Sequence, residues 1–142
     1  MRAMTTADAE LTAAPPPPSV LARTQFALAG VYAAAIAVAL GRAASFSGHL
    51  YLPRQGDEAT GNADLWPGLW GPVALLMIIV IGVLPVVALM TALVAVARLV
   101  TARVRGGAAY PRSLLVSTVL AVLVVASWTT PFVQTLHGWL LD

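Results

Sequence analysis

Uncharged, apolar stretches alternate with short polar segments along this chain, and their length predicts membrane-spanning helices. Residues 71–97 and 113–136 contain no charged side chain, and residues 24–45 contain only Arg42. An apolar stretch of about eighteen or more residues is long enough to form a transmembrane helix. The sequence therefore predicts an all-α integral membrane protein with three transmembrane helices over these ranges.

The amino-terminal segment has a different character. It is polar or rich in small residues, and it includes four consecutive prolines from Pro15 to Pro18, which favour polyproline II and cannot enter a helix interior. We expect residues 1–22 to form a disordered, Pro-rich cytoplasmic tail and residues 23–142 to form the transmembrane domain. A cleaved signal peptide is the alternative for the first span, but Arg42 interrupts the region where cleavage would occur.

The distribution of arginine predicts how the helices are oriented. The segment after the second span contains four arginines and no acidic residue: Arg98, Arg103, Arg105 and Arg112. Loops rich in arginine remain in the cytoplasm, so with three spans the amino terminus is cytoplasmic and the carboxyl terminus is outside. The same arginines are candidates for binding anionic lipid headgroups; the alternative is that they only set the topology.

Composition narrows the class of protein further. All eight basic residues are arginine, and alanine, glycine and proline are abundant, which indicates a GC-rich, bacterial genome and hence a bacterial plasma membrane. The net charge of +2 is too small for a nucleic-acid-binding surface. The absence of cysteine excludes disulfides and thiolate chemistry.

Small residues form stripes on the predicted helices, which favours close helix packing. The stripe on the first span alternates steps of three and four: Ala27, Gly30, Ala34, Ala37, Gly41, Ala44 and Gly48. Shorter stripes occur on the third span (Ser113, Ser117 and Ala121) and on the second span (Pro85, Ala88, Ala92 and Ala95). The alternative for the first span is that an Ala-rich helix produces such a stripe by chance.

The third span contains the strongest candidate for chemistry. Four polar residues at spacings of three and four predict one polar helix face beside Pro131: Ser127, Thr130, Gln134 and His137. Polar groups in hydrocarbon are costly unless they are paired. This face therefore predicts either a polar pocket open to the outside or hydrogen bonds between helices. We expect Thr129 and Thr130 to satisfy the backbone that Pro131 disturbs.

Two histidines, His49 and His137, are expected at similar depth near the outer helix ends. Paired imidazoles can ligate haem or a metal, but two histidines without a spacing motif are weak evidence, and we expect no cofactor. The spans contain no central acid or base, and the sequence has no phosphate loop, HExxH motif or nucleophile elbow.

These patterns predict a non-catalytic membrane protein that packs as an accessory subunit against itself or other membrane proteins, surrounded by membrane lipid. A transport or pore component that uses the polar face is one alternative function. A haem or metal binder at the two histidines is another.

Overall fold

The computed structural model describes residues 19–54, 66–104 and 112–141. The described residues form four helices and no strand: α2 (Val20–Ser47), α4 (Trp70–Val104), α5 (Arg112–Trp128) and α6 (Pro131–Leu140). The all-α prediction is confirmed. Predictions for residues 1–18 and for Arg105 lie outside the described residues.

Local capping sets the ends of α2. The Ser19 hydroxyl accepts a hydrogen bond from the Ala22 N–H at 3.3 Å, so the helix begins at Val20 and includes residues that we expected in the tail. At the other end Gly48 has a φ of 75°, and its N–H donates to the Ala44 carbonyl. Glycine adopts this left-handed cap without strain. Gly48 therefore ends the helix rather than continuing its stripe of small residues.

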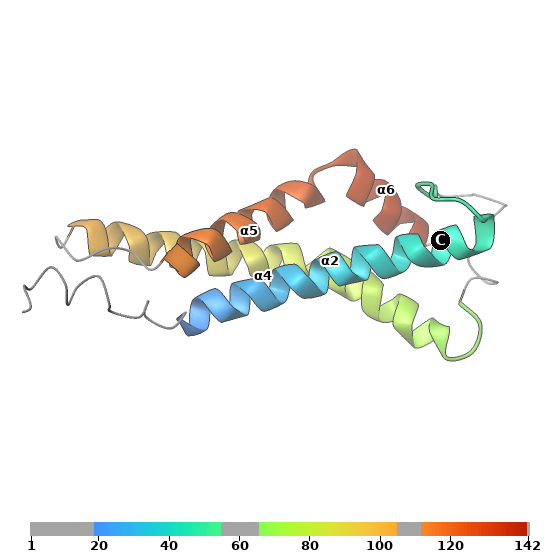
Figure 1. Ribbon diagram of the computed structural model, residues 1–142, viewed down its shortest axis with the longest axis horizontal. Coiled ribbons are helices and arrows are strands. Elements are labelled where there is room, and N and C mark those ends of the chain that lie inside the picture. Colours follow the sequence, from blue (N-terminus) through green and yellow to red (C-terminus); the bar gives the residue numbers. More distant parts are fainter. Residues whose placement is uncertain (1–18, 55–65, 105–111, 142) are drawn as a thin grey trace, which may run out of the picture.

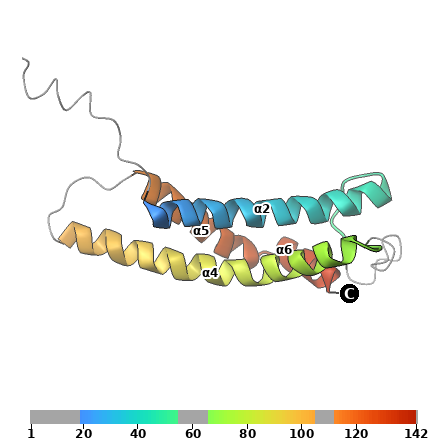
Figure 2. The same cartoon turned by 90° about the horizontal axis from the view of Figure 1, so that it is seen from below.

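The three long helices pack side by side, with α4 antiparallel to α2 and α5 (Figures 1 and 2). One end of this bundle, which we call the tryptophan end, holds Trp66, Trp70 and Trp139. The other, which we call the arginine end, holds Arg23, Arg98, Arg103 and Arg112. Tryptophan and arginine at opposite ends are typical of helices that cross a bilayer.

Helix length and exposed side chains both suit a membrane. α2 and α4 are long and apolar enough to cross one, and α5 with α6 would add a third crossing if this bent pair is a single span. With 35 residues, α4 is about 52 Å long at 1.5 Å per residue, which exceeds the hydrocarbon thickness of about 30 Å. Large aliphatic side chains on the outside, such as Leu76 and Leu123, are more than half exposed, as expected for groups that face lipid.

Alanine is the commonest residue in the core of the bundle. The predicted stripe of α4 is buried at Pro85, Ala88, Ala92 and Ala95. The buried side chains separate into a large cluster that extends to the tryptophan end and a small cluster of Ala22, Ala95 and Leu114 at the arginine end. The site that divides them is described below.

Candidate functional site

The predicted polar face of the third span surrounds a break in the helix. α5 ends at Trp128 and α6 begins at Pro131, and the two helices are bent by 68°. Pro131 lacks a backbone N–H and disfavours helical geometry in the residue before it. Thr130 accordingly has an extended backbone, and its hydroxyl caps α6 by accepting a hydrogen bond from the Val133 N–H.

The last carbonyls of α5, beside the break, accept hydrogen bonds from polar side chains. Those of Ala126 and Ser127 also accept the backbone N–H groups of Thr129 and Thr130. Three side chains donate hydrogen bonds of 2.6–2.7 Å to these carbonyls: Thr129 to Ala126, Thr130 to Ser127 and Gln134 to Trp128. The prediction that Thr129 and Thr130 satisfy the disturbed backbone is confirmed. Gln134 does the same, so its amide is engaged with the chain itself.

Ser127 and His137 have different neighbours and do not share a site. The Ser127 hydroxyl lies 3.2 Å from the Tyr32 hydroxyl of α2 and donates to the Val124 carbonyl at 2.8 Å. The His137 ring meets Trp128 edge-on at a centroid distance of 5.0 Å. The bend thus gives the members of the predicted face separate partners instead of one shared pocket.

His137 also explains a glycine in the middle of α4. A Cβ on Gly82 would lie 3.1 Å from Nε2 of His137, so only glycine allows this approach of α6 to α4 without displacement. The Nε2 atom is buried and has no hydrogen-bond partner among the described residues. This imidazole therefore acts as a packing group in the arrangement seen here.

The two histidines have different surroundings. His49 is exposed, its Nδ1 lies 3.0 Å from the Ser47 carbonyl, and its ring lies 5.4 Å from that of Tyr51. In the parts of the chain that the structure describes, no group of three or more His, Cys, Asp or Glu side chains could hold a metal ion.

A buried glutamine, which the sequence analysis did not identify, joins α2 to α5. Gln25 and Ser117 are both fully buried, and Thr118 is 7% exposed. The Gln25 Oε1 accepts a hydrogen bond from Ser117 at 2.7 Å and a longer one from Thr118 at 3.4 Å, while Nε2 has no partner among the described residues. This polar layer separates the large core cluster from the small one.

A sequence signal for Gln25 was available. It is an amide inside an apolar stretch, and it lies seven residues before Tyr32 on the same helix face. An isolated polar residue within a span normally faces the bundle interior.

The small-residue stripe of α2 does not face the core. Gly30, Ala34, Ala37 and Gly41 are exposed, as is Ala27, while Ala44 is half-buried. A Cβ on Gly30 or Gly41 would meet no atom within 4 Å. α2 packs inside the bundle through another face, which carries Ala35, Ala39 and Ala43. The stripe on α5 differs: Ser117 and Ala121 are buried, and Ser113 is half-buried.

Charged residues lie at both ends of the bundle. At the tryptophan end the Arg42 guanidinium lies over Trp70 at 4.6 Å, Phe46 at 5.4 Å and Trp66 at 6.0 Å from the ring centres. Cation–π contacts of this kind anchor an arginine among interfacial aromatic residues. The described members of the arginine group, Arg98, Arg103 and Arg112, are exposed.

Comparison of the chain with known protein families, curated proteins and solved structures found no match. The arguments for a function therefore come from the geometry described above. Its main features are a helix break whose polar side chains are hydrogen-bonded, a buried layer around Gln25, and an exposed stripe of small residues on α2.

Proposed function

We propose that this chain is a small, non-catalytic subunit of a membrane complex, either a homo-oligomer or a larger assembly, in a bacterial plasma membrane. The observation that carries the proposal is the outward-facing stripe of α2 formed by Gly30, Ala34, Ala37 and Gly41, called the α2 stripe below. These residues are exposed although the neighbouring face of the same helix is tightly packed.

The physical argument concerns how helices associate in lipid. Lipid chains are as apolar as a leucine side chain, so helix association depends on close packing rather than on burial from water. A strip without large side chains lets a second backbone approach closely, and a lipid chain fills such a groove less well than a helix does. The α2 stripe thus suits a helix of another subunit.

We further propose three membrane crossings, with α5 and α6 forming one broken span and the arginine end in the cytoplasm. Irregular backbone is tolerated at membrane depth where its polar groups are satisfied by protein. The hydrogen bonds from Thr129, Thr130 and Gln134 to the last carbonyls of α5 support the proposal. This topology places the carboxyl terminus outside.

The alternative functions receive less support from the geometry. A transport path needs polar groups that face a shared cavity, but Thr130 and Gln134 are bonded to carbonyls of their own chain. A haem or metal site needs ligands with a common focus, and His49 and His137 have separate neighbours.

The test compares the mass of the complex after mild detergent extraction for wild type, Gly30→Leu and Gly41→Leu. Each leucine enters open space in the isolated chain, so the fold is retained while a second helix is kept away. We expect association to weaken by about tenfold or more in both variants. Ala97→Leu, at an exposed position of α4, is the matched control. A stable wild-type monomer, or unchanged association in both glycine variants, would contradict the proposal.

A further inference from the structure

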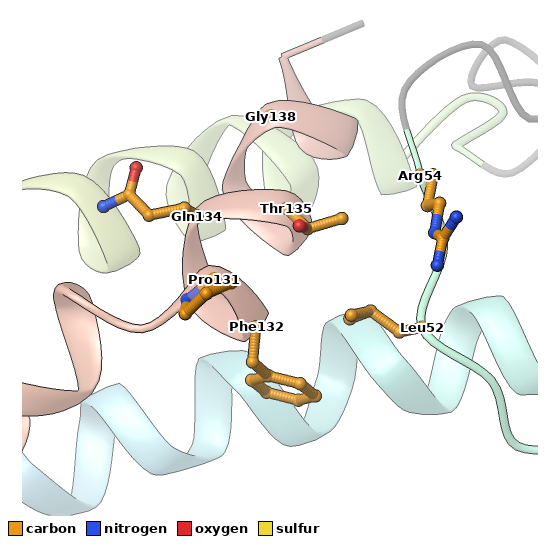
Figure 3. Close-up of a pocket in the computed structure, with 7 residues that line it drawn as sticks. All are labelled: Leu52, Arg54, Pro131, Phe132, Gln134, Thr135 and Gly138. Atoms are coloured by element: carbon orange, nitrogen blue, oxygen red, sulfur yellow. The ribbon is translucent and has the colours of Figure 1, made fainter.

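A pocket of about 580 Å³ lies between α6 and the segment that follows α2 (Figure 3). One wall is formed by Leu52 and Arg54. The other is the face of α6 on which Phe132, Thr135 and Gly138 recur every third residue. The volume falls within the range of about 300–1,000 Å³ that is usual for small-molecule sites.

Buried neighbours support the backbone of both walls of this open pocket. Pro53, between the two residues of the first wall, is among the fully buried side chains, and its ring restricts the local backbone. On α6, Leu136 and Trp139 belong to the large core cluster. Gln134 also borders the pocket, but its side chain points away (Figure 3) and bonds to the Trp128 carbonyl.

The lining changes from polar to apolar along the bundle axis. Figure 3 shows Arg54 toward the C-terminal end of α2, with Phe132 farther from that end. Arg54 is exposed, and Phe132 is 43% exposed. A cation near the end of the bundle and an aromatic ring nearer its middle follow the order of headgroup and acyl chain in a lipid of the same leaflet.

We infer that this pocket binds an anionic phospholipid, with the phosphate at Arg54 and an acyl chain on Phe132 and Leu52. The guanidinium group matches phosphate oxygens in a two-pronged geometry, and the Thr135 hydroxyl is a further donor in the lining. The site shares no residue with the α2 stripe or with the arginine end, so it does not depend on the proposed association.

Gly138 provides a variant that blocks the site without disturbing the core. A Cβ at this position meets no atom within 4 Å, and Gly138 is part of the pocket lining. Gly138→Leu therefore adds a side chain to the pocket and also removes a glycine from a helix, which favours the helical state.

The experiment titrates the full-length, ¹⁵N-labelled protein in maltoside micelles with dihexanoyl phosphatidylglycerol and follows the Thr135 amide signal. We expect a saturable shift that is abolished in Gly138→Leu. In Arg54→Gln we expect the affinity to fall by about tenfold, the effect of one charge-assisted hydrogen bond. Arg98→Gln, at the arginine end, is the matched control and leaves the affinity unchanged.

Two further titrations separate the possible sources of the phosphate. Inorganic phosphate alone and dihexanoyl phosphatidylcholine are expected to bind more weakly than the anionic lipid, because one lacks an acyl chain and the other carries a cation beside its phosphate. Equal affinity for inorganic phosphate would assign a free-phosphate site and overturn the inference. So would equal affinity for the zwitterionic lipid, or an unchanged shift in Gly138→Leu.

Discussion

At the residue scale, the buried amide of Gln25 makes one favourable and one unfavourable contribution to the free energy of unfolding. Its Oε1 accepts an interhelical hydrogen bond from Ser117, which contributes about 1 kcal/mol in a membrane. Its Nε2 is buried without a partner among the described residues, which costs about 1–3 kcal/mol. The unfavourable contribution is the larger, so this residue favours one helix register at the expense of stability.

This balance predicts opposite effects of two substitutions. Gln25→Leu removes the unpaired donor and should raise the free energy of unfolding by about 1 kcal/mol, whereas Ser117→Ala removes the acceptor's main partner and should lower it by about 1 kcal/mol. Unfolding in mixed micelles with increasing dodecyl sulfate measures both. A marked loss of stability in Gln25→Leu would mean that the unpaired Nε2 costs less free energy than the hydrogen bond from Ser117 contributes.

The contact between Gly82 and His137 predicts a change of sign in a double-mutant cycle. Gly82→Ala should lower the free energy of unfolding by about 1 kcal/mol, because the added Cβ would lie 3.1 Å from Nε2. In a His137→Ala background the same change should be neutral or stabilising, because alanine is the better helix former. The cycle is read from the same micelle titration. Equal effects in both backgrounds would argue against this contact.

At the element scale, the break between α5 and α6 shows what the sequence could and could not predict. Pro131 and its neighbouring threonines predicted a disturbed helix whose carbonyls are satisfied locally, and the hydrogen bonds confirm this. The spacing of Ser127, Thr130, Gln134 and His137 assumed one straight helix. A bend of 68° removes that common face, and the spacing of the polar residues does not encode its angle.

The stripes of small residues also separate what the sequence could predict from what it could not. Helical spacing correctly identified the stripes on α2 and α4 as continuous lines, but not which of them faces the core. Gly30 and Gly41 are exposed while Ala88 and Ala92 are buried. An Ala-rich helix has several similar faces. Which face is buried depends on how all three helices pack together.

The cause of the bend can be tested by removing Pro131. A proline costs about 3 kcal/mol in a helix interior, so Pro131→Ala should allow α5 and α6 to straighten. The chain has no cysteine, so spin labels at Val119→Cys and Leu141→Cys, both about 60% exposed, report the distance between the two helices. We expect this distance to lengthen in Pro131→Ala but not in the control Pro85→Ala. An unchanged distance would assign the bend to packing of α6 on α4.

At the scale of the whole molecule, the two ends of the apolar bundle differ: tryptophans gather around Arg42 at one end, and exposed arginines lie at the other. The aromatic residues around Arg42 and the exposed arginines at the other end suit two different membrane surfaces. This asymmetry, together with the length of α2 and α4, supports one orientation of the protein.

The orientation predicts which residues are accessible from outside the cell. Leu50 near the tryptophan end and Val104 at the arginine end are both 81% exposed, so they form a matched pair. We expect Leu50→Cys to react with a membrane-impermeant maleimide in intact cells, and Val104→Cys to react only after permeabilisation. Leu141→Cys should behave as Leu50→Cys does if α5 and α6 form one span. The reverse pattern would invert the topology.

The polar layer of Gln25 divides the core into a small and a large part, and this division determines which end of the bundle separates first. On one side, the core of the described residues consists of Ala22, Ala95 and Leu114, with two half-buried leucines packed against them. On the other side the contacts include large side chains such as Tyr32, Ile81 and Trp139. Thermal separation of the helices would therefore begin at the arginine end, while the contacts at the tryptophan end persist longer.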